Sequence, residues 1–120
     1  MTRNIKIIPD FPSLASADVS ASSAPQTYDI LILPGGGPGA KTFCTSEQVL
    51  ELIHAFRTAG KYVAAICAGT TALVASQKKH GGEKVRVTSH PSVKGEVEAE
   101  KWEYSEERVV VERKIVTSRG

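Results

Sequence analysis

Two short apolar segments, separated by an amphipathic one, limit the folds open to this chain. Residues 29–33 and 62–66 are almost uninterrupted apolar runs, which is typical of strands buried on both faces of a parallel sheet. Between them, four apolar residues recur at the i, i+3, i+4 and i+7 positions of one helix face: Val49, Leu52, Ile53 and Phe56. Ser46 is suited to the N-cap of this helix and Gly60 to its end. The order strand, helix, strand predicts a parallel βαβ unit and an α/β fold.

The remaining sequence adds shorter elements to this unit. We expect a strand at 4–8, a loop with one helical turn at 13–27, a helix at 70–77, a strand at 85–88, and strands at 108–111 and 115–117 that pair across a turn at 112–114. A chain of 120 residues fits one domain, which we place over 1–120.

Composition excludes several classes of partner. The net charge is only +2, and no basic stripe with interleaved aromatic residues is present, so nucleic acid is not expected as a partner. No apolar run is long enough to cross a membrane, and no signal-peptide core follows Met1. A cytoplasmic location is expected, with the nucleus or mitochondrion left open. No set of Cys, His and carboxylate residues has the spacing of a metal site.

Cys67 lies where the second apolar strand passes into a helix. Small residues two positions away on either side, Ala65 and Gly69, allow the sharp turn that a strand-to-helix nucleophile needs. The start of the following helix favours the ionised form of a thiol, which is the reactive one. The alternative is a buried structural cysteine. The second cysteine, Cys44, has no such turn and is expected to be an inert free thiol.

The glycine-rich segment after the first strand allows several interpretations. Residues 35–42 read G-G-G-P-G-A-K-T, one residue short of a P-loop, and they also contain a weak dinucleotide-binding pattern. We disfavour nucleotide binding because the next helix is expected to begin late, near Ser46, and because no suitable strand end offers a Mg²⁺-binding acid. A plain turn is one alternative. The other is an oxyanion site formed by the backbone N–H groups of Gly36 and Ala68.

His90 follows the strand at 85–88 and is fixed by Pro91. A base for a cysteine nucleophile must be near it in space, and not necessarily in sequence. Because the carboxyl ends of parallel strands share one edge of a sheet, the glycine-rich segment, Cys67 and His90 are expected to be neighbours. The alternative is a plain polar loop residue.

Four motifs in this order resemble the ThiJ/PfpI superfamily, and within it the branch of the Parkinson disease protein DJ-one. They are Leu33-Pro34-Gly35-Gly36, Ala64-Ala65-Ile66-Cys67-Ala68-Gly69-Thr70, Thr88-Ser89-His90-Pro91 and Thr117-Ser118-Arg119-Gly120. The similarity runs nearly from end to end. It implies a flavodoxin-like, doubly wound and mostly parallel sheet sandwiched by helices.

The resemblance also implies roles for individual residues. Cys67 would be the nucleophile and His90 its partner, while Gly35, Gly36 and Ala68 would present backbone to the substrate and its oxyanion. Two arginines, Arg3 and Arg119, would help to bind anionic groups. No cofactor, whether nicotinamide, metal or glutathione, is implied.

The resemblance further implies that this is a partial domain. Family members begin with another strand and helix, which carry a Glu that serves as general acid/base, and they end with a C-terminal helix that covers one face of the sheet. The present chain begins at what resembles the third strand of the family and stops at Gly120. No acid here matches the position of that Glu. The usual homodimer uses the first helix, so dimerisation is left open.

Three functional hypotheses follow. The first is an enzyme of the glyoxalase or protein-deglycase type, acting on methylglyoxal, glyoxal or a glycated protein through a Cys67 hemithioacetal, with a role in carbonyl and oxidative stress. The second is a redox-sensing chaperone in which Cys67 is oxidised to the sulfinic acid. The third is a fragment without activity because it lacks the Glu of the family.

Overall fold

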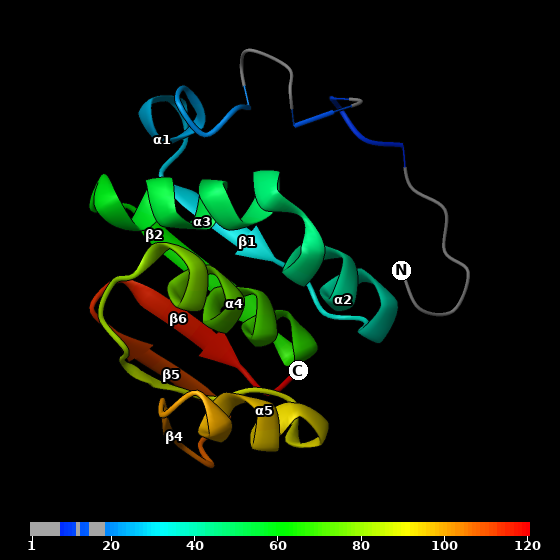
Figure 1. Ribbon diagram of the computed structural model, residues 1–120, viewed down its shortest axis with the longest axis vertical. Helices are drawn as coiled ribbons and strands as arrows, with labels where there is room; N and C mark the ends of the chain where they lie inside the picture. Colours follow the sequence, from blue (N-terminus) through cyan, green and yellow to red (C-terminus); the bar gives the residue numbers. More distant parts are fainter. Residues whose placement is uncertain (1–7, 12, 15–18) are drawn as a thin grey trace.

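The computed structural model describes residues 8–11, 13–14 and 19–120, and its centre is a four-stranded sheet (Figure 1). The strands lie in the order β1-β2-β6-β5. Their bounds are Ile30–Leu33 for β1, Tyr62–Ile66 for β2, Val109–Glu112 for β5 and Ile115–Ser118 for β6. Strands β1, β2 and β6 are parallel, and β5 is antiparallel to β6. The mostly parallel α/β sheet expected from the sequence is therefore present.

Helices precede and follow β2 along the chain. Their bounds are Ala24–Thr27 for α1, Gly37–Thr45 for α2, Glu47–Thr58 for α3, Thr70–His80 for α4 and Lys94–Ala99 for α5, with 3₁₀ turns η2 at Cys67–Gly69 and η3 at Pro91–Val93. A separate two-stranded parallel sheet pairs β3 (Arg86–Val87) with β4 (Glu103–Tyr104). The helical turn predicted within 13–27 is α1. The strand predicted at 4–8 lies outside the described residues except for Ile8, which belongs to no element.

The central helix α3 forms for the reasons that its sequence indicates. The Ser46 side chain accepts a hydrogen bond from the backbone N–H of Val49 at 3.3 Å, which caps the first turn. Gly60, just past the last turn, has a φ of 74°, which suits glycine. The apolar face of α3 is buried, and Ile53 at its centre has no exposed surface. The predicted βαβ unit is confirmed by this helix and by the parallel pairing of β1 with β2.

Two features differ from the prediction. Helix α2 begins at Gly37, within the glycine-rich segment, so the expected late start near Ser46 is wrong. Pro38 and two glycines concealed the helix, because isolated residues of these types disfavour helix interiors although proline is well tolerated in a first turn. The strand expected at 85–88 forms only as β3, which pairs with β4 instead of joining the main sheet.

The hairpin of β5 and β6 matches its sequence signal. Glu112 pairs with Ile115, which leaves a two-residue turn of Arg113 and Lys114. Both turn residues have positive φ, 49° and 65°, as a type I′ turn requires. The turn lies at the amino end of β6.

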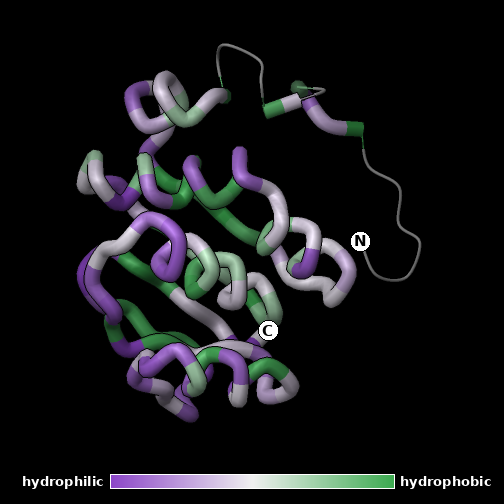
Figure 2. Tube along the Cα trace, in the orientation of Figure 1, coloured by the Kyte–Doolittle hydropathy of each residue, from purple (hydrophilic) through white to green (hydrophobic). Residues whose placement is uncertain are grey.

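The two faces of the main sheet differ in their surroundings. Helices α3 and α4 lie over one face (Figure 1), where Leu33, Val63 and Ala65 are buried. Large apolar residues on the same strands are exposed: Ile30, Ile32, Tyr62, Ile66, Val109 and Val111. Figure 2 shows these strands as strongly hydrophobic. The expectation that β1 and β2 are buried on both faces is therefore wrong for the described residues.

Candidate active site

Cys67 has an unusual backbone conformation. It follows β2 directly and is the first residue of the turn η2, which continues into α4. Its φ is 61°, a left-handed value that costs energy for any residue with a side chain. Such values cluster at functional sites, where the surrounding structure holds the residue in place. The sharp strand-to-helix turn predicted around Cys67 is present.

Glycines pack directly against Cys67 and its turn. A Cβ placed on Gly35 would lie 2.7 Å from the Cβ of Cys67, and one on Gly120 would lie 3.0 Å from the same atom. A Cβ on Gly69 would lie 2.6 Å from the carbonyl oxygen of Leu33. A side chain at Gly35 or Gly69 would force these neighbouring atoms to shift, and one at Gly120 would make a tight contact in a backbone conformation that favours glycine. The glycines allow the end of β1, the Cys67 turn and the end of β6 to meet at one point.

His90 is joined to Cys67 through the backbone. Its N–H donates to the carbonyl oxygen of Cys67 at 3.1 Å. The ring nitrogen Nδ1 accepts from the backbone N–H of Ser92 at 3.1 Å and lies 2.7 Å from the Ser92 hydroxyl. Since Nδ1 accepts, the proton of the neutral ring is assigned to Nε2. The side chain is exposed and available to a ligand.

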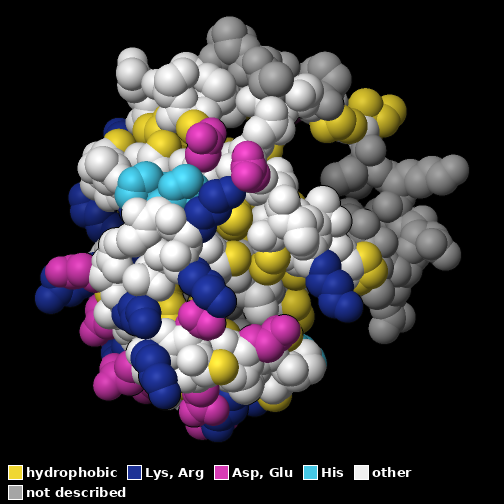
Figure 3. Space-filling view, in the orientation of Figure 1, with side chains coloured by type: hydrophobic (Ala, Val, Ile, Leu, Met, Phe, Trp, Pro, Cys, Tyr) yellow, Lys and Arg dark blue, Asp and Glu magenta, His cyan; other side chains and the backbone are white. Residues whose placement is uncertain are grey.

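A cavity of about 880 Å³ connects these groups. Its walls come from α2, the Cys67 turn and the segment from His90 into α5, and it includes four of the residues expected to form the site: Gly36, Cys67, Ala68 and His90. Figure 3 shows a hollow with apolar side chains between these helices. The glycine-rich segment and Cys67 are therefore neighbours at the carboxyl edge, as the parallel topology predicts. His90 is also their neighbour, although β3, which precedes it, lies outside the main sheet.

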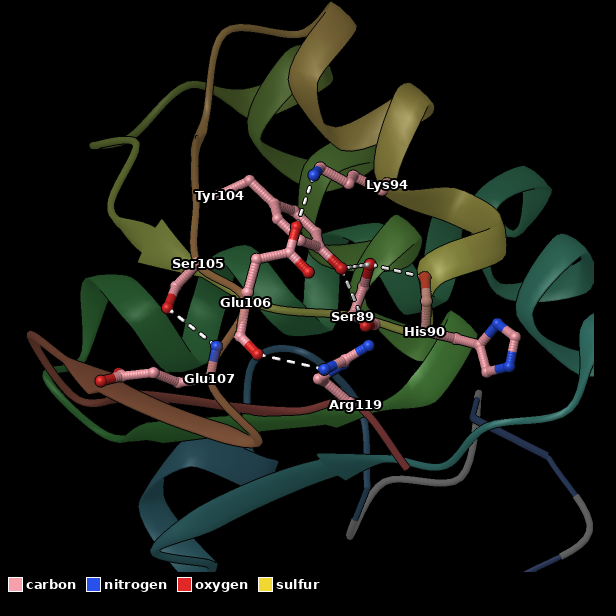
Figure 4. Close-up of polar contacts among 8 residues, drawn as sticks. All are labelled: Ser89, His90, Lys94, Tyr104, Ser105, Glu106, Glu107 and Arg119. Atoms are coloured by element: carbon pink, nitrogen blue, oxygen red, sulfur yellow. Dashed lines mark hydrogen bonds and ion pairs between the residues drawn. The ribbon is translucent and has the colours of Figure 1, made fainter.

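Arg119 does not line this cavity. Its Nη1 donates to the backbone carbonyl of Glu106 at 3.1 Å, and its own N–H donates to the carbonyl of Arg108 at 3.0 Å. Figure 4 shows Arg119 in a polar cluster beside His90, whose ring points away from the cluster. The other predicted anion-binding residue, Arg3, lies outside the described residues. The structure thus leaves both assignments as predictions.

The same polar cluster fixes the segment that carries His90. The Ser89 hydroxyl donates to the carbonyl of His90 at 3.0 Å, and the Tyr104 hydroxyl donates to the carbonyl of Ser89 at 2.9 Å (Figure 4). Nearby, a hydrogen bond from Lys94 lowers the pKa of the Glu106 carboxyl and raises the pKa of Lys94. These contacts tie the start of α5 to the segment that follows β4.

Three ionisable residues of the cavity were not singled out from the sequence for this site. Glu96 on α5 is the one carboxylate among the described lining residues, and Lys41 on α2 is the one lysine. Cys44 also lines the cavity, and its thiol donates to the Thr71 hydroxyl at 3.4 Å. Their place in the cavity depends on the packing of α2 and α5. The only sequence signal for it was their short distance along the chain from Gly36 and His90.

Both cysteines are free thiols, as expected. Among residues 8–11, 13–14 and 19–120, no cluster of three or more His, Cys, Asp or Glu side chains is arranged to hold a metal ion. Within the same ranges, no helix is long and apolar enough to cross a membrane.

Comparison with known proteins identifies relatives over nearly the whole chain. The model of the DJ-1/PfpI family matches residues 6–120. A glutathione-independent glyoxalase DJ-1 of Schizosaccharomyces pombe is 38% identical over 102 residues, which are 84% of this chain and 51% of that protein. The Parkinson disease protein 7 homolog of Danio rerio is 36% identical over 120 residues, covering 99% of this chain and 59% of that protein.

Solved structures agree with this result. Schizosaccharomyces pombe DJ-1 superposes with a TM-score of 0.75 at 38% identity, covering 84% of this chain and 52% of that one. Drosophila melanogaster DJ-1beta superposes with a TM-score of 0.78 at 28% identity, covering 98% of this chain and 58% of that one. The chain therefore spans between half and three-fifths of the length of these relatives.

Proposed function

Because the chain belongs to the DJ-1/PfpI family, we propose that it carries the active site of a glutathione-independent glyoxalase with Cys67 as its nucleophile. One observation carries the proposal: the strained Cys67 turn and His90 line the same cavity, next to the glycine backbone that follows β1. Relatives from Schizosaccharomyces pombe and Caenorhabditis elegans are named as enzymes of this type. The substrate class is a small 2-oxoaldehyde such as methylglyoxal or glyoxal.

The first step is addition of the Cys67 thiolate to the aldehyde carbon. A carbon–sulfur bond forms, the carbonyl π electrons move to oxygen, and protonation of that oxygen gives a hemithioacetal. Backbone N–H groups of Gly36 and Ala68, which line the cavity, are the proposed donors to the oxyanion. The thiolate is the nucleophilic form of a cysteine, and Cys67 lies at the start of the turn that leads into α4.

The second step moves a hydrogen between the two substrate carbons. A base removes the proton from the former aldehyde carbon, and the neighbouring ketone oxygen is protonated to give an enediol. The enediol takes up a proton at the second carbon and loses the hydroxyl proton on the sulfur-bearing carbon, which gives a thioester. Since His90 Nδ1 accepts from Ser92, its Nε2–H is suited to donate to a substrate oxygen. Glu96 is the carboxylate of the cavity that can accept the carbon-bound proton.

Hydrolysis completes the cycle. Water adds to the thioester carbonyl, the carbon–sulfur bond breaks, and the hydroxy acid leaves as Cys67 is restored. The net change for methylglyoxal is the addition of one water to give lactate. The cavity volume of about 880 Å³ exceeds what methylglyoxal needs, so an aldehyde adduct on a glycated protein side chain is a second substrate for the same thiol.

The test is lactate formation from methylglyoxal without glutathione. Replacement of Cys67 by Ala should lower kcat/KM by about 1,000-fold or more, since it removes the only group that forms the covalent intermediate. Cys67→Ser keeps a side chain of similar size and should be nearly as inactive, which separates loss of the nucleophile from loss of packing. Circular dichroism checks that both variants fold. Equal rates in wild type and Cys67→Ala would refute the proposal.

A redox-sensing role is the second candidate, and the partial exposure of Cys67 at an open cavity supports it. Peroxide would oxidise the thiolate to the sulfenic acid with release of water, and a second equivalent would give the sulfinic acid. After mild peroxide treatment, mass spectrometry should locate at least about five times more added oxygen on Cys67 than on Cys44, because the thiolate is the form that reacts. Faster oxidation of Cys44 would contradict this role.

A further inference from the structure

A second cavity lies at the opposite edge of the main sheet, near the amino ends of β2 and β6. Its volume is about 260 Å³, and its walls come from the last turns of α3, the loop residues 60–61 and 81–85, and the β5–β6 turn with the start of β6. Among the described residues, it shares no lining residue with the cavity of Cys67. Ligands of parallel α/β sheets usually bind at the carboxyl edge, so the general rule for the fold does not account for this cavity.

The lining of this amino-edge cavity is strongly cationic. Four positive side chains converge on it: Arg57, Lys61, Arg113 and Lys114. One carboxylate, Glu83, is also present, so four positive charges and one negative charge leave +3 with His54 neutral. The whole chain has a net charge of only +2, and the rest of the molecule is therefore slightly acidic. Such a concentration of positive charge in a small cavity favours the binding of an anion.

Only part of this charge is neutralised within the protein. Arg113 pairs with Glu83 at 2.9 Å, and Lys61 lies 3.7 Å from Asp29. Within the described part of the chain, Arg57 and Lys114 form no ion pair with a carboxylate. Lys114 Nζ donates to the carbonyl of Gly60 at 2.9 Å, which places its ammonium group at the cavity wall and leaves it further N–H donors.

Arg57 is held in place more firmly than a surface arginine. Its Nη2 donates to the carbonyl of Glu83, and its guanidinium carbon lies 6.0 Å from the ring centre of Trp102. A Cβ on Gly82 would lie 3.1 Å from Arg57 Nη1, so the glycine makes room for the guanidinium against the backbone. Burial lowers the pKa of Arg57, against the opposing effect of Glu83. An anion in the cavity would offset part of this desolvation.

We propose that the amino-edge cavity is a binding site for a phosphate monoester. A fixed guanidinium presents paired N–H donors that match two oxygens of a phosphate, and the Lys114 ammonium adds a point charge. A phosphate monoester carries nearly two negative charges at neutral pH, which suits the charge of the wall better than a single carboxylate does. The small volume admits the phosphate group and a short substituent. This proposal does not depend on the glyoxalase reaction.

The chain contains a built-in reporter of this cavity. Trp102 is its only tryptophan, is buried, and lies beside Arg57. Its fluorescence, together with titration calorimetry, can follow binding of inorganic phosphate, glycerol phosphate and a phosphoserine tripeptide at constant ionic strength in potassium chloride. Tighter binding of glycerol phosphate would identify a small metabolite as the source of the phosphate. Tighter binding of the tripeptide would identify a phosphorylated protein chain.

Variants distinguish specific binding of phosphate in the cavity from nonspecific attraction of an anion to positive charge. Lys114→Gln and Arg57→Lys should each weaken phosphate binding about fivefold or more, the first by removing a charge and the second by removing the guanidinium fork. Lys78→Gln removes one exposed positive charge that is outside the lining of this cavity and pairs with Glu100, and it should change affinity by less than about 1.5-fold. Comparable weakening by Lys78→Gln, or binding of phosphate no tighter than that of chloride in the calorimeter, would overturn the proposal. If the Arg57→Lys variant fails to fold, the Lys114→Gln variant still tests the proposed phosphate site.

Discussion

The two edges of the main sheet carry cavities of opposite character. At the carboxyl edge, a large cavity with an apolar hollow contains a strained thiol, an imidazole, one lysine and one carboxylate. At the amino edge, a cavity of about 260 Å³ contains four cationic side chains around one carboxylate. The first cavity is suited to a reaction at one sulfur atom, whereas the described lining of the second provides charge but no cysteine.

This difference reflects how each edge is formed. The carboxyl edge brings together strand ends that meet through glycines, so its backbone is fixed by close contacts around Cys67. The amino edge is made of loops and a two-residue turn, and long side chains supply its chemistry. We expect substitutions at the carboxyl edge to alter catalysis or folding, and substitutions at the amino edge to alter binding alone.

The largest effect within this comparison is expected from Glu96→Gln. Loss of the cavity carboxylate as a proton acceptor should lower kcat for lactate formation by about 100-fold, in the range typical of general-base catalysis. Glu98→Gln is the matched control, because this exposed glutamate lies on the same helix and outside the cavity lining. Steady-state kinetics of the two variants provide the measurement. Equal activity in both would remove Glu96 from the mechanism.

The next effect concerns the backbone of the carboxyl edge. Gly69→Ala would place a Cβ 2.6 Å from the carbonyl oxygen of Leu33 and should lower the free energy of unfolding by about 2–3 kcal/mol through overpacking. Gly39→Ala has open space around the added methyl group and should raise it by about 0.5 kcal/mol because alanine favours the helix. Urea denaturation measures both. Equal stability of the two variants would contradict the close packing described here.

The smallest effect tests whether the two edges are independent. Lys114→Gln should leave lactate formation within about twofold of wild type, because effects of distant sites without shared partners are usually separable. Glu96→Gln should likewise leave phosphate affinity within the same limit. Kinetics and calorimetry on both variants give the answer. A large loss of lactate formation in Lys114→Gln would show that the edges are coupled.

Several elements could be predicted because their signals are local. The apolar period of α3, its Ser46 cap and the terminal Gly60 lie within one segment of sequence. The β5–β6 hairpin was recognised from its flanking β-branched residues. The sequence did not predict α2, because the glycine and proline residues at its start outweigh its weak apolar pattern. It did not predict α5, because a helix of six residues is too short to show a helical repeat of apolar residues.

The candidate site was predictable in part. Cys67, His90 and Gly36 were expected at one edge because parallel strand ends lie together, and all three line one cavity, although the strand before His90 is not part of the main sheet. Glu96 and Cys44 could not be found in this way, because their positions depend on how α5 and α2 pack. The exposed face of the sheet was also missed, since a continuous apolar run does not show what covers each side.

By itself, the sequence determined the βαβ unit, the sharp turn at Cys67 and the family, because these depend on short-range patterns of residue type and spacing. Only the tertiary structure decided which polar side chains share a cavity with the thiol and which cations converge at the opposite edge. Those groups come from segments far apart in the chain, and their proximity results from packing that no local pattern records.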